Sequence, residues 1–326
     1  MAQKENHLRK FGKTRLQLSP LGLGTWQFSK RKNLAGKFWP VLSDEESYKI
    51  VQAAYNNGIN WFDTAELYGN GESERTLSRA LELAGIKDQD VYVATKWSPI
   101  LRFAGSIVKT IGEREKALGG YTISLHQVHN PLSFSSVRKE MLAMARLVNE
   151  NQVKYVGVSN FSASQMQKAH EELSKHGYVL ASNQVQYNML NRKIEQNGIM
   201  ETAKELGIAI IAYSPLAQGL LTGKYHDNPE EIKGKKGFRK RMAAFKDSRL
   251  KQTKPLIDKL KQIAEKHEAT PAQIALNWLI NFHGEKVFAI PGASNTKQAE
   301  SNATAMKIKL LKEEMDLLDE ISKQIQ

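Results

Sequence analysis

Four residues that could move or stabilise a proton lie at the ends of short apolar runs. Asp63, Lys96 and His129 each follow such a run directly, and Tyr68 comes five residues after Asp63. Short apolar runs are typical of buried strands, and a charged side chain is rarely buried without a partner. We therefore predict that the four side chains meet in one active site. The runs are residues 60–62, 91–95 and 124–128.

A tyrosine beside a lysine can donate a proton to a carbonyl oxygen. A tyrosine hydroxyl ionises at about pH 10, so near neutral pH it is a weak acid unless a cation stabilises its phenolate. Lys96 could be that cation, and Asp63 could pair with Lys96 from the adjacent strand. His129 could orient a carbonyl oxygen or relay a proton. The four residues thus predict an acid directed at a carbonyl group.

Each of the four residues also has a structural interpretation when it is taken alone. Asp63 could cap a turn, and Lys96 could reach solvent along an apolar surface, as lysine at a strand end commonly does. Tyr68 could pack beside Gly69, and His129 could be a buried histidine with satisfied hydrogen bonds. Only their joint arrangement favours catalysis over these interpretations.

Eight apolar, β-branched runs alternate with segments of helical periodicity. Such alternation predicts parallel βαβ units, and eight units predict an α/β fold of the closed (β/α)8 TIM barrel type. We expect one barrel domain over residues 1–326, because α/β barrels commonly use this length for a single domain. Catalytic groups in such barrels lie at the C-terminal ends of the strands. The runs begin near Leu21, Asn60, Val91, Ser124, Lys154, Ala181, Ile208 and Val287.

Flanking segments predict two additions to the barrel and one long loop. Residues 8–18, with a turn at Gly12-Lys13, predict an N-terminal β-hairpin that closes the bottom of the barrel. Apolar residues at helical spacing from Leu311 to Ile321 predict an extra C-terminal helix. Residues 214–251 are rich in Gly, Lys and Arg and show little periodicity, which indicates an active-site loop.

The composition excludes several kinds of protein and of chemistry. No run approaches the roughly 18 apolar residues of a membrane span, and the first ten residues are polar, so we expect a cytoplasmic protein with no membrane partner. The chain contains no cysteine, which removes disulfides, thiolate metal sites and cysteine nucleophiles. We expect no metal, and the chemistry must therefore use oxygen, nitrogen or a cofactor.

The chain is basic, with 47 Lys and Arg against 34 Asp and Glu and a net charge of +13. A positive surface attracts polyanions, so nucleic acid is an obvious partner to consider. The densest basic segment, residues 233–241, carries no recognised nucleic-acid motif, and we expect no sequence-specific nucleic-acid binding. A solvated loop or a lid over a phosphorylated cofactor fits this segment better.

Seven short motifs follow one another along the chain. They are Asp63-Thr64-Ala65 with Tyr68-Gly69 and Glu74, then Lys96 after Val93-Ala94-Thr95, His129-Asn130-Pro131, Gly157-Val158-Ser159-Asn160-Phe161, Ser182-Asn183-Gln184, Ala212-Tyr213-Ser214-Pro215-Leu216 and Ile290-Pro291-Gly292. In this order they resemble the signatures of the aldo-keto reductase family along nearly the whole chain. Each motif alone is weak evidence, but chance agreement of seven in order is improbable.

The resemblance implies hydride transfer from a nicotinamide cofactor to a small-molecule aldehyde or ketone. Tyr68 would be the acid, and Asp63, Lys96 and His129 would support it. NADPH (NADP⁺ when oxidised) would be the cofactor, with NADH less favoured.

The resemblance also implies a cofactor site in the barrel mouth. Backbone N–H groups after the seventh barrel strand would meet the negative charge of the pyrophosphate. The residues implied are Thr25, Trp26 and Asp63 near the catalytic groups; Ser159, Asn160 and Gln184 for the carboxamide; Tyr213 for stacking on the nicotinamide ring; Ser214, Pro215, Leu216, Gln218, Gly219 and Leu220 around the pyrophosphate; and Gly292, Ser294, Asn295, Lys297, Gln298 and Asn302 at the adenosine end.

Two positions depart from the family's pattern. His126 stands where a tyrosine is common, and because it lies three residues before His129, the two would point to opposite faces of a regular strand. We assign catalysis to His129, which precedes the Asn130-Pro131 turn. Ser294 stands where a basic residue is common, so Lys297 or the basic segment would have to supply the charge that favours NADPH.

Aromatic side chains in loops at the predicted barrel mouth could line an apolar substrate pocket. We assign this role first to Trp26 and Trp97, with Phe28, Trp39 and Phe103 as further candidates. Barrels of this kind also resemble subunits of potassium channels, so a cofactor-sensing regulatory subunit with little turnover is the rival function. The physiological substrate and the oligomeric state do not follow from the sequence.

Overall fold

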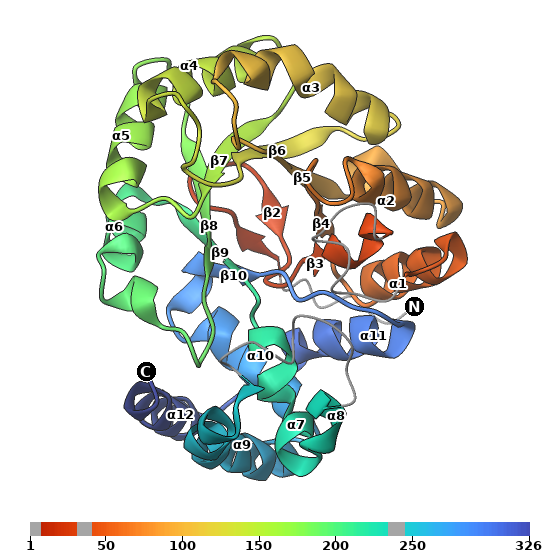
Figure 1. Ribbon diagram of the computed structural model, residues 1–326, viewed down its shortest axis with the longest axis vertical. Coiled ribbons are helices and arrows are strands. Elements are labelled where there is room, and N and C mark those ends of the chain that lie inside the picture. Colours follow the sequence, from red (N-terminus) through yellow and green to blue (C-terminus); the bar gives the residue numbers. More distant parts are fainter. Residues whose placement is uncertain (1–7, 31–40, 234–244) are drawn as a thin grey trace.

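Eight parallel strands form a curled, barrel-like sheet in the computed structural model, which describes residues 8–30, 41–233 and 245–326 (Figure 1). The strands lie in the sheet in chain order, because each connection returns through a helix to the same end of the sheet. The predicted (β/α)8 architecture is confirmed. The strands are β3 (Leu23–Gly24), β4 (Trp61–Asp63), β5 (Tyr92–Trp97), β6 (Ile123–Val128), β7 (Tyr155–Ser159), β8 (Leu180–Gln186), β9 (Ala209–Tyr213) and β10 (Val287–Ala289).

Contacts between the first and the last of these strands close the sheet. Single parallel bridges join Leu21 to Ala289 and Gly24 to Gly292. Gly24 is required by the close approach of the two backbones, since a Cβ there would lie 2.9 Å from the carbonyl oxygen of Ile290. A residue without a Cβ therefore lets β3 and β10 pair.

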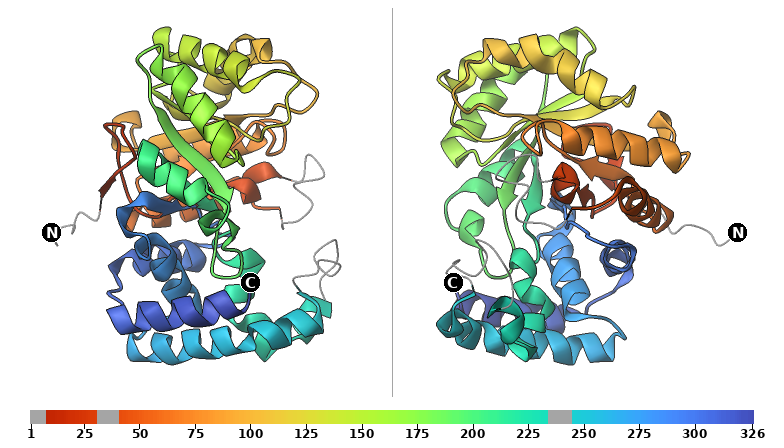
Figure 2. Two further views of the ribbon diagram at one scale, coloured as in Figure 1. Left: turned by 90° about the vertical axis from the view of Figure 1, so that its left-hand side faces the viewer. Right: turned by 45° about the vertical axis from the view of Figure 1, so that its right-hand side comes forward.

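Helices surround the sheet on its outer side (Figures 1 and 2). Helix α1 begins at a capping box formed by Ser43 and Glu46, and α10 begins at Thr270 with Pro271 at its first position. The predicted final helix is confirmed as α12. The helices are α1 (Asp44–Asn56), α2 (Glu72–Leu83), α3 (Gly105–Ala117), α4 (Val137–Asn149), α5 (Ala163–Ser174), α6 (Ile199–Leu206), α7 (Lys224–Asp227), α8 (Glu230–Lys233), α9 (Asp247–Lys266), α10 (Pro271–Asn281), α11 (Thr296–Thr304) and α12 (Lys312–Gln324).

The predicted N-terminal hairpin is confirmed and plugs one end of the barrel. Its strands, β1 (Arg9–Lys10) and β2 (Gln17–Leu18), pair antiparallel. Phe11 follows β1, and its buried ring lies 5.0 Å from the ring of Phe288 inside the barrel. Gly12 has a φ of 55°, and a Cβ there would lie 2.9 Å from the carbonyl oxygen of Ala181, near the start of β8. The hairpin thus covers the N-terminal ends of the strands and leaves the C-terminal ends for a site.

The connection from β9 to β10 contains more helix than the sequence predicted. We predicted an active-site loop with little periodicity over residues 214–251. Its described part is not irregular, because the 3₁₀ helix η5 (Ala217–Thr222), α7, α8 and the start of α9 lie there. Gly223, with a φ of 80°, ends η5 and begins α7. Such turns depend on single backbone conformations rather than on apolar periodicity, so the pattern did not reveal them.

Two predictions fall largely outside the described residues. Trp39 and nearly all of the basic segment at residues 233–241 lie in the ranges 31–40 and 234–244. Within the ranges that the structure describes, no helix combines the length and the apolar character needed to span a bilayer.

Candidate active site

A buried ion pair lies at the C-terminal ends of β4 and β5. Lys96 Nζ pairs with Asp63 Oδ1 and donates a second hydrogen bond of 2.8 Å to the carbonyl oxygen of Thr64. Asp63 closes β4, and parallel pairing with β5 brings the two strand ends together. Burial acts to lower the pKa of Lys96, but the charge of Asp63 and the interaction with Tyr68 raise that pKa above its ordinary value. The amine therefore stays charged.

Two glutamine amides hold the second oxygen of Asp63. Gln184 Nε2 donates to Asp63 Oδ2 over 2.9 Å, and Gln127 Nε2 donates to the same atom over 3.3 Å. The resemblance assigned Gln184 to the cofactor's carboxamide, yet its amide nitrogen is directed at Asp63. Sequence reasoning missed Gln127, although a glutamine within the apolar run of β6, two residues before His129, was the available signal.

Tyr68 lies against the lysine of this pair. Lys96 Nζ is 5.1 Å from the centre of the Tyr68 ring and interacts electrostatically with its hydroxyl. Burial raises the pKa of Tyr68, Lys96 acts to lower it, and Asp63 adds to the rise, with a net upward direction. The lysine acts in the predicted direction, because it lowers this pKa, but burial outweighs it. The phenol instead remains protonated near neutral pH, so it can hold a proton for transfer.

His129 faces Tyr68 as a neutral imidazole. It directly follows β6, and its ring meets the Tyr68 ring edge-on with the centres 5.7 Å apart. Burial, aided by the nearby charge of Lys96, lowers the pKa of His129 to about 3. Among the described residues its buried Nδ1 atom has no hydrogen-bond partner. A neutral imidazole has one N–H donor and one acceptor nitrogen, so it can hydrogen-bond a carbonyl oxygen or a hydroxyl group that reaches it.

His126 lies in β6 but does not join this group. Its side chain is 1 % exposed, and burial together with the charge of Arg114 on α3 lowers its pKa to about 3. Arg114 belongs to the helix layer outside the sheet, so His126 points outward. The two histidines therefore lie on opposite sides of the sheet, as their spacing predicted.

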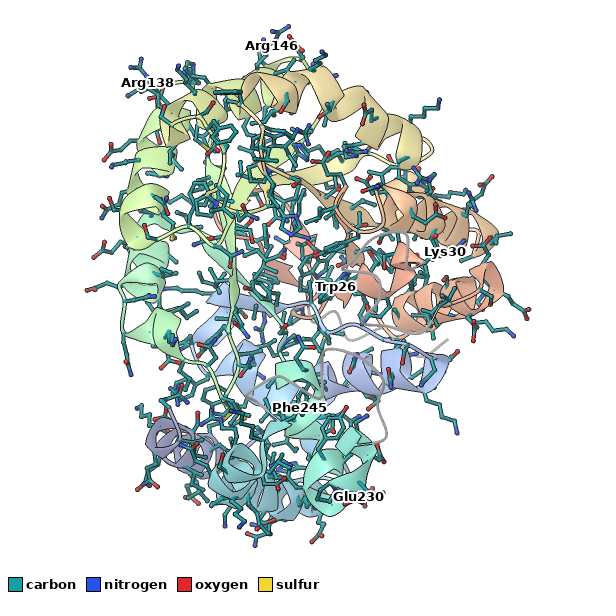
Figure 3. All side chains as sticks on the ribbon, viewed as in Figure 1. Trp26, Lys30, Arg138, Arg146, Glu230 and Phe245 are labelled. Carbon is teal, nitrogen blue, oxygen red and sulfur yellow. The ribbon has the colours of Figure 1, made fainter. Side chains whose placement is uncertain are left out.

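The described aromatic residues that were predicted to line a pocket lie in three different surroundings. Trp26 stacks on Tyr68 with the ring centres 6.1 Å apart, and its side chain lies near the centre of the ring of strands in Figure 3. Trp97 and Phe28 are each 1 % exposed and belong to the core between sheet and helices, so they offer no surface to a substrate. Phe103, in the connection from β5 to α3, is 63 % exposed, and its ring centre lies 5.4 Å from that of the exposed Phe134.

Thr25 binds the backbone at the end of β4. It is fully buried, and its hydroxyl donates to the carbonyl oxygen of Asp63 over 2.9 Å. The backbone N–H of Thr25 donates to the same oxygen. Thr25 therefore fixes the end of β4, beside the ion pair.

Polar groups predicted to hold a nicotinamide carboxamide gather at the ends of β7 and β9. Asn160 has a φ of 60°, and its amide nitrogen donates to Ser159 Oγ over 3.1 Å. The Tyr213 hydroxyl donates to Asn160 Oδ1 over 3.1 Å. Ser159 is buried, whereas Asn160 is exposed and Tyr213 is half-buried. An aromatic ring and an amide thus meet at the mouth of the barrel.

The segment after Tyr213 is tightly turned. Ser214, Ala217, Gln218 and Gly219 all have positive φ values. The Ser214 carbonyl oxygen accepts a hydrogen bond of 3.0 Å from Asn188. The other predicted pyrophosphate residues divide by burial: Pro215 and Leu220 are buried, whereas Leu216, Gln218 and Gly219 are half-buried.

The residues predicted for the adenosine end lie around the start of α11. Asn295 caps this helix, and its side chain accepts a bond from the backbone N–H of Gln298. Gln298 Oε1 in turn accepts bonds from the backbone and the hydroxyl of Ser294. Asn302 is buried and donates to the carbonyl oxygen of Gly292 over 3.3 Å, while Lys297 is exposed.

Comparisons with known proteins agree with the fold and with the motifs. Residues 20–323 match the model of the aldo/keto reductase family. The aldo-keto reductase str7 of Strobilurus tenacellus is 34 % identical over 313 residues, which cover 94 % of this chain and 89 % of that protein. The chloroplastic pyridoxal reductase of Arabidopsis thaliana is 33 % identical over 321 residues, which cover 95 % and 84 %.

A solved structure extends the agreement to the tertiary level. The glycerol dehydrogenase of Gluconobacter oxydans superposes with a TM-score of 0.84 at 26 % identity, covering 97 % of this chain and 95 % of that one. The family match runs from the first barrel strand to the final helix, and it includes the residues of the buried ion pair. The protein is therefore an oxidoreductase that acts on carbonyl compounds with a nicotinamide cofactor, and the chain belongs to the aldo/keto reductase family.

Proposed function

We propose that this protein reduces a small aldehyde or ketone to an alcohol with NADPH, and that Tyr68 donates the proton. The observation that carries the proposal is the contact of a protonated phenol with a buried ammonium and a neutral imidazole. Tyr68 holds the proton, Lys96 supplies positive charge beside it, and His129 offers a nitrogen to the carbonyl oxygen.

The chain's own residues would act at the moment when negative charge develops. As the carbonyl oxygen gains charge, the Tyr68 hydroxyl passes its proton to that oxygen, and the ammonium of Lys96 stabilises the phenolate that remains. Asp63 keeps the lysine charged and in place. Because these groups are already fixed in a buried site, they need little reorganisation during the reaction.

The residues at the mouth fit a nicotinamide group. Tyr213 presents a half-buried aromatic ring, and Asn160 beside it presents an exposed amide. The buried and unpartnered Nδ1 of His129 lies next to the Tyr68 ring, within the part of the chain that the structure describes. When bound there, a reduced nicotinamide supplies the hydride.

A preference for NADPH is supported by charge near the start of α11. Lys297 is exposed in the first turn of this helix, where the backbone N–H groups also favour an anion. Because the extra phosphate of NADPH carries up to two negative charges, a lysine at this place favours it over NADH. Replacing Lys297 with glutamine should raise the Kd for NADPH and leave that for NADH unchanged.

Two relatives indicate a substrate class. The names of the pyridoxal reductase and the glycerol dehydrogenase describe small polar carbonyl or alcohol substrates of those proteins. We propose a small-molecule carbonyl substrate for this chain as well.

The decisive experiment replaces Tyr68 with phenylalanine. Loss of a general acid lowers turnover by about 10²–10⁴-fold. We therefore expect kcat for NADPH oxidation to fall in this range over a panel of carbonyls, with NADPH binding retained. Tyr121→Phe is the matched control, because it removes a hydroxyl bonded only to the carbonyl oxygen of Ile86, away from the mouth.

The panel also tests the rival function. If the wild-type protein binds NADPH but oxidises it no faster with any carbonyl than without one, a sensing subunit is the better interpretation. If Tyr68→Phe keeps full turnover, the assignment of the proton donor is wrong.

A further inference from the structure

Glu66 lies beside the four catalytic candidates, and none of the roles assigned above explains its contacts. It lies two residues before Tyr68, in the loop from β4 to α2, and is 9 % exposed. Its carboxylate accepts bonds from the Ser98 backbone N–H and from Arg102, each of 2.5 Å, and it pairs with Arg114 through its other oxygen. One carboxylate therefore joins the Tyr68 loop, the segment after β5 and helix α3.

Two backbone bonds also join Glu66 to the strand that carries Lys96 and to the end of its own loop. The Glu66 N–H donates to the carbonyl oxygen of Lys96 over 3.3 Å, and the Glu66 carbonyl oxygen accepts from the N–H of Gly71 over 2.8 Å. A hydrogen bond between residues 66 and 71 thus closes the loop that carries Tyr68, and a second one joins this loop to the strand that carries Lys96.

A second carboxylate, Glu74, shares Arg114 and binds the residue before Lys96. Arg114 Nε lies 2.9 Å from Glu74 Oε2, and Glu74 Oε1 accepts a bond of 2.6 Å from the hydroxyl of Thr95, the residue before Lys96. Burial raises the pKa of Glu74 to about 7, against the opposing effect of Arg114, so near neutral pH Glu74 carries only part of a charge. Arg114 thus pairs with both carboxylates, Glu66 through Nη1 and Glu74 through Nε.

We propose that Glu66 is a positioning residue, which holds the hydroxyl of Tyr68 in register with Lys96 through its bonds to Ser98, Arg102 and Arg114. This inference rests on the proposed function only for its kinetic consequence. Its structural consequence, a rigid loop over residues 64–71, can be measured without turnover.

The experiment replaces Glu66 with glutamine, which keeps the size and one acceptor oxygen but removes the charge. Because a misplacement of about 1 Å can cost about 10²-fold in rate, we expect kcat to fall by about 10- to 100-fold. The KM for substrate and the Kd for NADPH should stay within about threefold, since Glu66 touches no residue assigned to the cofactor. With NADPH deuterated at C4, the isotope effect on kcat should be at least as large as in the wild type, because the chemical step has become slower.

Hydrogen exchange measured by mass spectrometry gives the readout that does not depend on activity. Amides of residues 64–71 and 98–104 should exchange at least several-fold faster in Glu66→Gln than in the wild type. Glu172→Gln is the matched control, because Glu172 is also buried and ion-paired, with Lys175 at 2.8 Å, but lies on α5 away from the mouth. The control should leave kcat and the exchange of both segments unchanged.

Arg102→Gln provides a milder variant in case Glu66→Gln does not fold. It leaves Arg114 to neutralise Glu66 and should give a smaller change of the same kind in kcat and in exchange. Unchanged exchange over residues 64–71 in the variants overturns the inference, whatever happens to kcat. A higher KM at constant kcat also overturns it, because Glu66 would then act on substrate binding. If the wild type reduces no carbonyl, the proposed function fails and the exchange result alone decides the role of Glu66.

Discussion

Replacing Lys96 with methionine tests the buried ion pair, since the change removes the cation and keeps most of the side chain's volume. Asp63 is 1 % exposed and would keep its amide donors Gln127 and Gln184 but lose its counter-charge. Breaking a buried ion pair by removing one partner costs about 3–5 kcal/mol, because the remaining charge is uncompensated. With an unfolding entropy of about 2.1 cal/mol/K per residue, a chain of this length should lose about 4–7 °C in Tm.

Scanning calorimetry of Lys96→Met, Asp63→Asn and the double variant measures this coupling. The double variant buries neither charge. Its loss of stability should therefore be smaller than the two single losses added together, by about 1–3 kcal/mol. Lys254→Met is the control, because its partner Asp258 lies 2.6 Å away in an exposed pair, and such pairs are worth about 1 kcal/mol or less. Losses in the two single variants that simply add would refute the reasoning, as the two groups would then not stabilise each other.

Two further predictions concern stability. The first depends on the burial of a histidine, and the second on the packing around two glycines. His126 has a folded-state pKa of about 3, so the unfolded chain binds its proton first as the pH falls through about 6.5, and the free energy of unfolding decreases there. Between pH 7.5 and 5.0 the wild type should lose about 2 kcal/mol of its free energy of unfolding through this residue. Urea titrations of His126→Gln should show a loss over this pH range that is smaller by about 2 kcal/mol. An equal loss in the wild type and the variant would contradict the prediction. Gly24→Ala should cost about 1–3 kcal/mol, because the new Cβ would meet the Ile290 carbonyl oxygen. Gly112→Ala, in the interior of α3 with open space around it, should instead stabilise by about 0.5–1 kcal/mol, and a similar Tm for the two alanine variants would count against this account.

Much of the barrel could be predicted because its signals are local. Each strand is a short apolar run, and each start predicted from the sequence lies within two residues of the observed strand. The placement of Asp63 and Lys96 at neighbouring strand ends follows from parallel pairing alone. The turns of η5 and α7 escaped prediction, since a few backbone conformations rather than a repeating pattern specify them.

The sequence by itself determined the barrel, the hairpin plug and the set Asp63, Tyr68, Lys96 and His129, because strand periodicity and the order of the motifs are properties of neighbouring residues. Only the tertiary structure decided that Gln127 and Gln184 both face Asp63, that Trp97 is buried in the core, and that the net pKa of Tyr68 rises. These outcomes depend on which residues, far apart in the chain, pack together and so exclude water. Desolvation and the sum of opposing charges arise from packing in three dimensions, and no local pattern encodes them.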